Sequence, residues 1–190
     1  MKVLLQFLFV TLFTLLPTPS NAKQCLTSIT RIHRHASRSI ELMDSSTDKM
    51  RDFLMKSIDF EWISKKTLPH TWPMLSKEKR LEFIGLLKQL MYVTYIGPGT
   101  TGGSTIIPAP TLEWTKHGGA TLQAAISNKS IQTIVEIVMT KVRGGCWVIR
   151  NVLIDDVNMV KNYKEQFRII VIKRGFEELL RRMRKRVAKA

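Results

Sequence analysis

Asp155 and Asp156 are the two residues of this sequence whose type and spacing most suggest chemistry. Neighbouring residues on a strand point to opposite faces, so one carboxylate could face inward while the other is solvated. A single buried aspartate can act as a general base in a cone-shaped α+β fold. The pattern favours a turn and a helix N-cap instead, because a helix is expected to begin near Met159 and short acceptors suit that position. We therefore expect no catalytic residue, with a small enzyme that uses Asp155 or Asp156 as the alternative.

Other catalytic and metal-binding patterns fail on their spacing. The loop from Gly97 to Ser104 resembles a phosphate-binding loop, but Gly103 occupies the position of the essential lysine and the loop follows a helix instead of opening one. His33 and His35 are two residues apart on a predicted helix, so their rings point in nearly opposite directions. With only two cysteines, a four-cysteine zinc site is excluded. We expect neither a metal site nor an enzymatic cofactor.

The chain is strongly basic. Its 190 residues include 30 Lys and Arg against 15 Asp and Glu, a formal net charge of +15, while 44% hydrophobic residues exclude a disordered polycation. The partner is therefore anionic: nucleic acid, lipid headgroups or an acidic protein face. The densest cluster is near the C-terminus, where a helix dipole alone would also favour cations. The candidates for an anionic-surface or docking role are Arg181, Arg182, Arg184, Lys185 and Arg186.

Residues 1–22 have the pattern of a secretory signal peptide. Lys2 is followed by an apolar run over residues 3–16, and the small residues Ser20 and Ala22 precede a cleavage site. The run is too short for a membrane span, which needs about 20 apolar residues. Export makes nucleic acid an improbable partner. It also permits a disulfide between Cys25 and Cys146, the alternative being two separate cysteines.

The remaining chain, residues 23–190, predicts helices, then strands, then helices, in one α+β domain. Apolar spacing predicts helices over 25–43, from the caps at 45–48 through Ile63, and from Ser76 to Tyr95. Beyond a Gly/Thr/Pro loop, a period of two predicts four antiparallel strands at about 111–116, 120–127, 131–142 and 146–154. Two helices follow, over 159–173 and 176–188, separated at Gly175. One sheet face is apolar, and we expect the helices to cover it.

The stretch from Trp147 to Phe167 resembles the MlaC family, the auxiliary component of toluene-tolerance systems. Members carry a Trp strand, a pattern like Asp-Val-x-Ile-Glu-Gly-Val-Ser-Leu-Val-x-Asn-Tyr-Arg-x-Gln-Phe, and a glycine before a last basic helix. Asn162-Tyr163, Gln166-Phe167 and Gly175 match this pattern. The sequence differs from it where Asn151 replaces Asp, Asp156 replaces Gly and Asn158 replaces Ser.

The resemblance implies a periplasmic lipid carrier, with a curved antiparallel sheet and helices that enclose an apolar cavity. Its cargo would be a phospholipid, although a hopanoid would suit the same cavity. Its partners would be an outer-membrane lipoprotein complex and an inner-membrane ABC transporter with a mammalian-cell-entry component, besides transient membrane contact. Burying an acyl chain gains roughly 0.8 kcal/mol per CH₂, which requires an apolar lining. The candidates for that lining, which are alternatively ordinary core, are Phe83, Leu87, Leu90, Val135, Ile137, Met139, Val157 and Tyr163.

Overall fold

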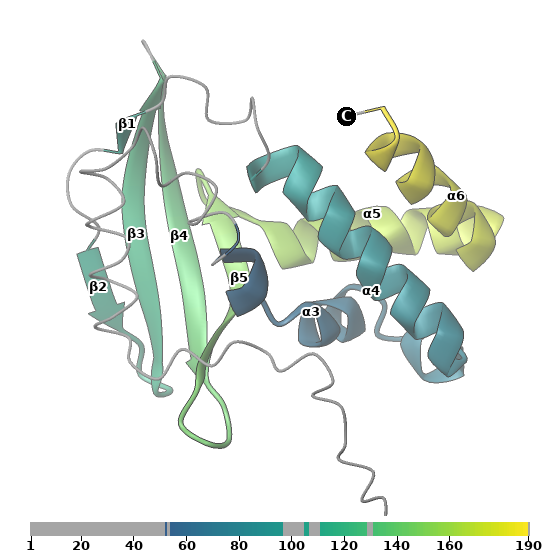
Figure 1. The fold of residues 1–190 in the computed structure, drawn as a ribbon, viewed down its shortest axis with the longest axis horizontal. Coiled ribbons are helices and arrows are strands. Elements are labelled where there is room, and N and C mark those ends of the chain that lie inside the picture. The colour runs from purple at the N-terminus through teal and green to yellow at the C-terminus, as the bar shows by residue number, and fades with distance from the viewer. Residues whose placement is uncertain (1–51, 53, 97–104, 107–110, 129–130, 190) are drawn as a thin grey trace, which may run out of the picture.

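The computed structural model describes residues 52, 54–96, 105–106, 111–128 and 131–189 (Figure 1). The expected signal peptide and the expected helix over 25–43 lie outside these residues. Within the described part, no helix has both the length and the apolar character needed to cross a membrane.

An antiparallel sheet forms one layer of the molecule, and the helices lie to one side of it (Figure 1). The four predicted strands are confirmed, and two strands of two residues each extend the sheet. The order is β1-β3-β4-β5-β6, and β2 pairs with the same edge of β3 as β1 does. The α+β class is therefore confirmed. The strands are β1 (Thr105–Ile106), β2 (Thr111–Trp114), β3 (Gly119–Asn128), β4 (Ile131–Lys141), β5 (Trp147–Ile154) and β6 (Val157–Asn158).

The helices begin and end close to the boundaries that the sequence predicts. The hydroxyl of Ser76 accepts a hydrogen bond from the Lys79 N–H and so caps α4, as expected. The C-terminal end of α4 continues as a π-helical turn, η2, up to Ile96. The helical elements are α3 (Phe60–Thr67), the 3₁₀ turn η1 (Trp72–Met74), α4 (Lys77–Met91), η2 (Tyr92–Ile96), α5 (Met159–Arg174) and α6 (Phe176–Val187).

The helix predicted to continue through Ile63 is interrupted at Ile58 and Asp59. Ile58 forms a parallel bridge with Ile149 of β5, and the Asp59 N–H donates to the Ile149 carbonyl over 2.9 Å. Asp59 then caps α3, because its carboxylate accepts from the N–H of Trp62. The apolar spacing is continuous through this point, so periodicity alone does not reveal the break. Contact with a strand far along the chain creates it.

The inner face of the sheet is apolar, as the period of two predicts. Register places Ala120 beside Met139 and Leu122 beside Ile137, so that these side chains share the face turned toward the helices. Ala120, Leu122 and Met139 are buried in the core, and Ile137 packs against them with partial exposure. Burial is therefore deepest near one end of the sheet.

A second part of the core lies between the helices. Phe83 of α4 is fully buried, and its ring contacts three others, with centroids 5.7 Å from Phe167, 6.0 Å from Phe176 and 6.4 Å from Trp72. Leu180 of α6 is also fully buried. Aromatic side chains bury large areas, so these contacts hold α4, α5 and α6 together as one layer.

Gly175 separates α5 from α6 at a φ of 86°, a conformation that L side chains rarely adopt. A Cβ added at Gly175 meets no atom within 4 Å, and the same is true of Gly85 in the middle of α4. We expect Gly175→Ala to lower the free energy of unfolding by about 1–2 kcal/mol, because only the backbone is strained. Gly85→Ala should instead raise it by about 1 kcal/mol, because alanine favours a helix. Urea unfolding of both variants measures the two changes, and equal signs would contradict this explanation.

Candidate functional site

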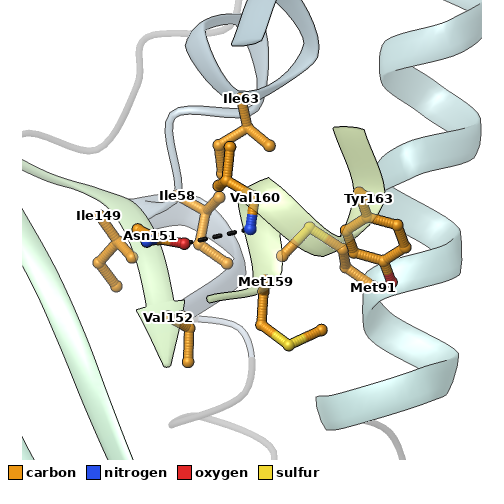
Figure 2. Close-up of a pocket in the computed structure, with 9 residues that line it drawn as sticks. All are labelled: Ile58, Ile63, Met91, Ile149, Asn151, Val152, Met159, Val160 and Tyr163. Carbon is orange, nitrogen blue, oxygen red and sulfur yellow. Dashed lines mark hydrogen bonds between the residues drawn. The ribbon is translucent and has the colours of Figure 1, made fainter. Parts of the chain in front are cut away.

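A small pocket lies where strand β5 meets the first turns of α5 (Figure 2). We call this place the seam. Seven of its nine lining residues are aliphatic or methionine side chains, and the other two are Asn151 and Tyr163. The pocket has a volume of about 10 Å³, which is about the space that one water molecule needs. The residues that line it are Ile58, Ile63, Met91, Ile149, Asn151, Val152, Met159, Val160 and Tyr163.

Asn151 is the polar side chain that reaches across the seam. Its Oδ1 accepts from the Val160 N–H over 3.2 Å, as the dashed line in Figure 2 shows. Asn158 accepts from the Lys161 N–H over 2.9 Å and is the N-cap of α5. Two amide oxygens thus satisfy N–H groups that the first turn of a helix leaves free. Because this bond is made, the Asn151 carbonyl adds little polarity to the apolar wall.

Tyr163 forms the wall of the pocket next to Met91 (Figure 2). Its ring stacks on Phe167 with a centroid distance of 5.3 Å and contacts Tyr95 edge-on at 6.5 Å. Burial, and then the neighbouring Tyr95, raise the pKa of Tyr163 far above its usual range. The phenol therefore stays neutral at any physiological pH, and Tyr163 presents an aromatic face to the pocket rather than a charge.

Asp59 and Arg150 form a mostly buried ion pair beside the pocket. Arg150 Nη2 lies 3.3 Å from Asp59 Oδ2, and the guanidinium lies over the Trp62 ring, 5.1 Å from its centroid. Arg150 is also the extra residue of a β-bulge, because Val138 pairs with Asn151 while Met139 pairs with Ile149. The bulge and the ion pair together fix α3 against β5.

The structure brings only one of the predicted lining residues, Tyr163, to this pocket. Phe83 and Leu87 are fully buried in the helical core, and Leu90 and Met139 are buried as well. The remaining three are more exposed. Val135 and Ile137 are partly buried on the sheet face, and Val157 is half exposed next to the β5–β6 turn.

Five of the pocket residues that the sequence analysis did not select fall into two groups. Ile63 and Met91 belong to apolar helix stripes that the spacing reveals, but nothing in a stripe distinguishes a pocket wall from close-packed core. Ile149, Asn151 and Val152 line the pocket together because the bulge at Arg150 changes the alternation of β5. No sequence signal marks that bulge.

Asp155 and Asp156 form the turn between β5 and β6, and both are exposed, with φ values of 46° and 64°. Asp155 Oδ1 accepts from the Ile134 N–H over 2.8 Å. The expected turn is confirmed, but the expected cap is wrong, because Asn158 caps α5 instead. Neither carboxylate has the burial that a general base would require here. Among the described residues, no group of three or more His, Cys, Asp and Glu side chains could hold a metal ion.

The basic cluster on α6 is exposed but largely occupied by carboxylates. Arg181 and Arg182 both bind Glu178, 2.6 Å and 2.8 Å away, and Arg184 reaches Glu82 on α4. The two guanidiniums lower the pKa of Glu178 to about 2. Within the described part of the chain, Lys185 and Arg186 make no ion pair.

Cys146 lies directly before β5 and is disulfide-bonded. Cys25, the chain's other cysteine, lies outside the described residues. The disulfide of Cys146 is therefore a covalent constraint at the end of the sheet where β5 begins.

The fold and the seam define an α+β protein whose helices pack against β5, on the apolar side of an antiparallel sheet. The family model for the MlaC protein matches residues 25–185, and the chain therefore belongs to the MlaC family. Among solved structures, the chain is similar to a phospholipid-binding protein from Ralstonia solanacearum, solved in complex with a phospholipid. The two chains are 16% identical and superpose with a TM-score of 0.60 over 84% of this chain and 87% of the other. This likeness shows a shared fold. No curated protein sequence gives a significant match.

The Asp59–Arg150 pair generates a stability prediction. Asp59→Ala leaves the Arg150 charge without its partner and removes the cap of α3, so it should lower the free energy of unfolding by about 3 kcal/mol. The matched control is Asp52→Ala, which removes an exposed ion pair with Lys56 and should change stability by about 0.5 kcal/mol or less. Chemical denaturation of both variants checks this. Similar losses in the two variants would show that the buried pair does not fix α3 to β5.

Proposed function

We propose that this protein is a periplasmic carrier that binds the acyl chains of a phospholipid at the seam. The observation that carries the proposal is the apolar wall of the pocket, which is continuous with the core between the sheet and the helices. Membership of the MlaC family supports it, and so does the fold shared with a protein that holds a phospholipid. The phospholipid is cargo, and the function needs no catalytic residue and no cofactor.

The apolar wall provides the free energy that a carrier needs. An acyl chain leaving a membrane loses roughly 0.8 kcal/mol of stabilisation per CH₂, on the order of 10 kcal/mol for a whole chain. The carrier has to replace this through burial, and an apolar seam can do so. A polar cleft could not, since its own groups would lose hydration without gaining hydrogen bonds.

Lipid binding requires the pocket at the seam to widen. Its volume of about 10 Å³ is far below the roughly 300–1,000 Å³ of typical ligand sites. The side chains at its border are suited to such a change, because Ile137, Val152 and Ile154 are only partly buried against the core. Met91 and Met159 line the pocket, and methionine adapts its shape readily. We therefore place the opening between the sheet face and α4.

The predicted lining residues have distinct places in the open form. Ile137, Met139 and Val135 would extend the lining along the sheet, and Tyr163 would remain in the wall. Val157 lies near the entrance, and the last three candidates pack behind the lining, in the helical core: Phe83, Leu87 and Leu90.

The proposed setting follows from the sequence and the family. Residues 1–22 would direct export and be removed, and residues 23–190 would form a single carrier domain in the periplasm. We propose that this domain exchanges lipid between an outer-membrane lipoprotein complex and an inner-membrane ABC transporter with a mammalian-cell-entry component. Such exchange would maintain the lipid asymmetry of the outer membrane.

The α6 cluster is proposed as the surface that docks on acidic faces of these partner complexes. Its arginines already bind carboxylates, because Arg181 contacts both oxygens of Glu178 over 2.6 Å and 2.8 Å. Planar guanidiniums suit this two-point contact. A partner's carboxylates could replace Glu178, while Lys185 and Arg186 are exposed without an ion pair among the described residues.

A pair of tryptophan substitutions tests where the cargo binds. Val152→Trp fills the seam and should reduce the phospholipid recovered per protein at least fivefold, at a stability cost of about 1–3 kcal/mol. Ile169→Trp, on the exposed side of α5, should leave it unchanged. Protein purified from the periplasm is extracted, and lipid phosphorus is measured per mole of protein. Full lipid content in a folded Val152→Trp variant would refute binding at the seam.

A further inference from the structure

Two turns lie together at one end of the sheet. In an antiparallel meander, alternate connections fall at the same end, so the β2–β3 turn and the β4–β5 turn are neighbours (Figure 1, lower end of the sheet). Both turns are closed by hydrogen bonds of 3.1 Å, from Gly118 N–H to the Thr115 carbonyl and from Gly145 N–H to the Val142 carbonyl. The two turns therefore present a fixed surface to solvent.

Trp114 is the most prominent side chain at this end. It is the last residue of β2 and is 65% exposed, although tryptophan is usually among the more buried residues. Its ring contacts the buried Trp147 edge-on, with centroids 5.7 Å apart, so the indole is supported from below. An indole that packs on one side and is exposed on the other suits the boundary between water and lipid, where an apolar ring and a polar N–H are both satisfied.

Three cations lie at the same end of the sheet as Trp114, because Lys141 pairs with Trp147 in the register and Lys116 and Arg143 belong to the two turns. Lys116, Lys141 and Arg143 are all exposed, and none of them forms an ion pair within the described part of the chain. Strands β2 to β5 carry two carboxylates, and neither one is paired with these cations. Glu113 precedes Trp114 and so points to the opposite face of β2, and Glu136 lies mid-strand, bonded to Gln123. Among the described residues of these strands and turns, the three cations therefore have no carboxylate partner, unlike Arg181, Arg182 and Arg184 on α6.

We propose that this sheet-end surface, formed by Trp114, Lys116, Lys141 and Arg143, binds the surface of an anionic phospholipid bilayer. The indole enters the headgroup layer, and the three cations contact lipid phosphates. The inference rests on the proposed function only in that a lipid carrier must approach membranes. The surface itself is separate from the seam, so vesicle binding and cargo binding can be measured independently.

Vesicle sedimentation tests this surface. The purified protein is mixed with vesicles of phosphatidylglycerol and phosphatidylethanolamine in equal parts, or with vesicles of phosphatidylcholine alone. We expect binding to the anionic vesicles and little to the neutral ones. Trp114→Ala should weaken the binding about tenfold, and the triple variant Lys116→Gln/Lys141→Gln/Arg143→Gln about 100-fold. The triple variant changes only exposed side chains, so it keeps the test valid if Trp114→Ala unfolds.

A matched control removes the same charge from α6. Arg181→Gln/Arg182→Gln/Lys185→Gln should weaken vesicle binding less than threefold, and lipid phosphorus per protein should stay at the wild-type value in every variant. Equal losses in both triple variants would overturn the proposal, because the attraction would then depend on net charge alone. So would a wild-type protein that binds neither vesicle.

Discussion

The attachment of β5 to the segment before α3 is the constraint on which the rest of this structure depends. Three contacts meet there: the bridge between Ile58 and Ile149, the hydrogen bond from the Asp59 N–H to the Ile149 carbonyl, and the ion pair of Asp59 with Arg150. A buried carboxylate is stable only with such partners. Because α5 also starts from β5, through the β6 turn and the Asn151 contact, both walls of the pocket are set by one strand.

This arrangement separates a fixed part of the molecule from an adaptable one. The fixed part is β5 with α3 and the start of α5, held by hydrogen bonds and charge. We take the adaptable part to be the border between the sheet face and α4, where Ile137 and Val152 are only partly buried and Met91 lines the pocket. Apolar contacts of this kind have no fixed direction, so they can be exchanged for acyl-chain contacts at little net loss. A closed seam is therefore compatible with a carrier, provided that α4 moves relative to the sheet.

Local chemistry was sufficient to predict much of the fold. Alternating residues and glycine-rich turns predicted the four long strands, Ser76 marked the start of α4, and Gly175 marked the end of α5. Each of these signals acts over a few residues. The break at Asp59 was missed because it depends on Ile149, 90 positions away, and the apolar spacing continues through it. The cap of α5 was assigned to the wrong residue, since Asp155, Asp156 and Asn158 all offer short acceptors and only the backbone of the turn decides among them.

The site was harder to predict than the fold. Apolar stripes identify the faces that are buried, but the pocket depends on the bulge at Arg150, which sequence does not reveal. In the sequence, the cations of α6 have no evident partner. In the structure, Arg184 pairs with Glu82, which is 102 residues away along the chain. Trp114 was also missed, because its sequence context resembles that of a core tryptophan. Only the fold shows that it is exposed.

The central claim is that the pocket at the seam widens between the sheet face and α4 to hold a phospholipid, and native mass spectrometry of the wild-type protein tests it most directly. Protein purified from its own cell envelope without detergent should carry an excess mass equal to a phospholipid, which is released on collisional activation. Extraction of the same sample should identify that lipid. A monodisperse, folded protein that repeatedly shows only the mass of its own chain would contradict the account.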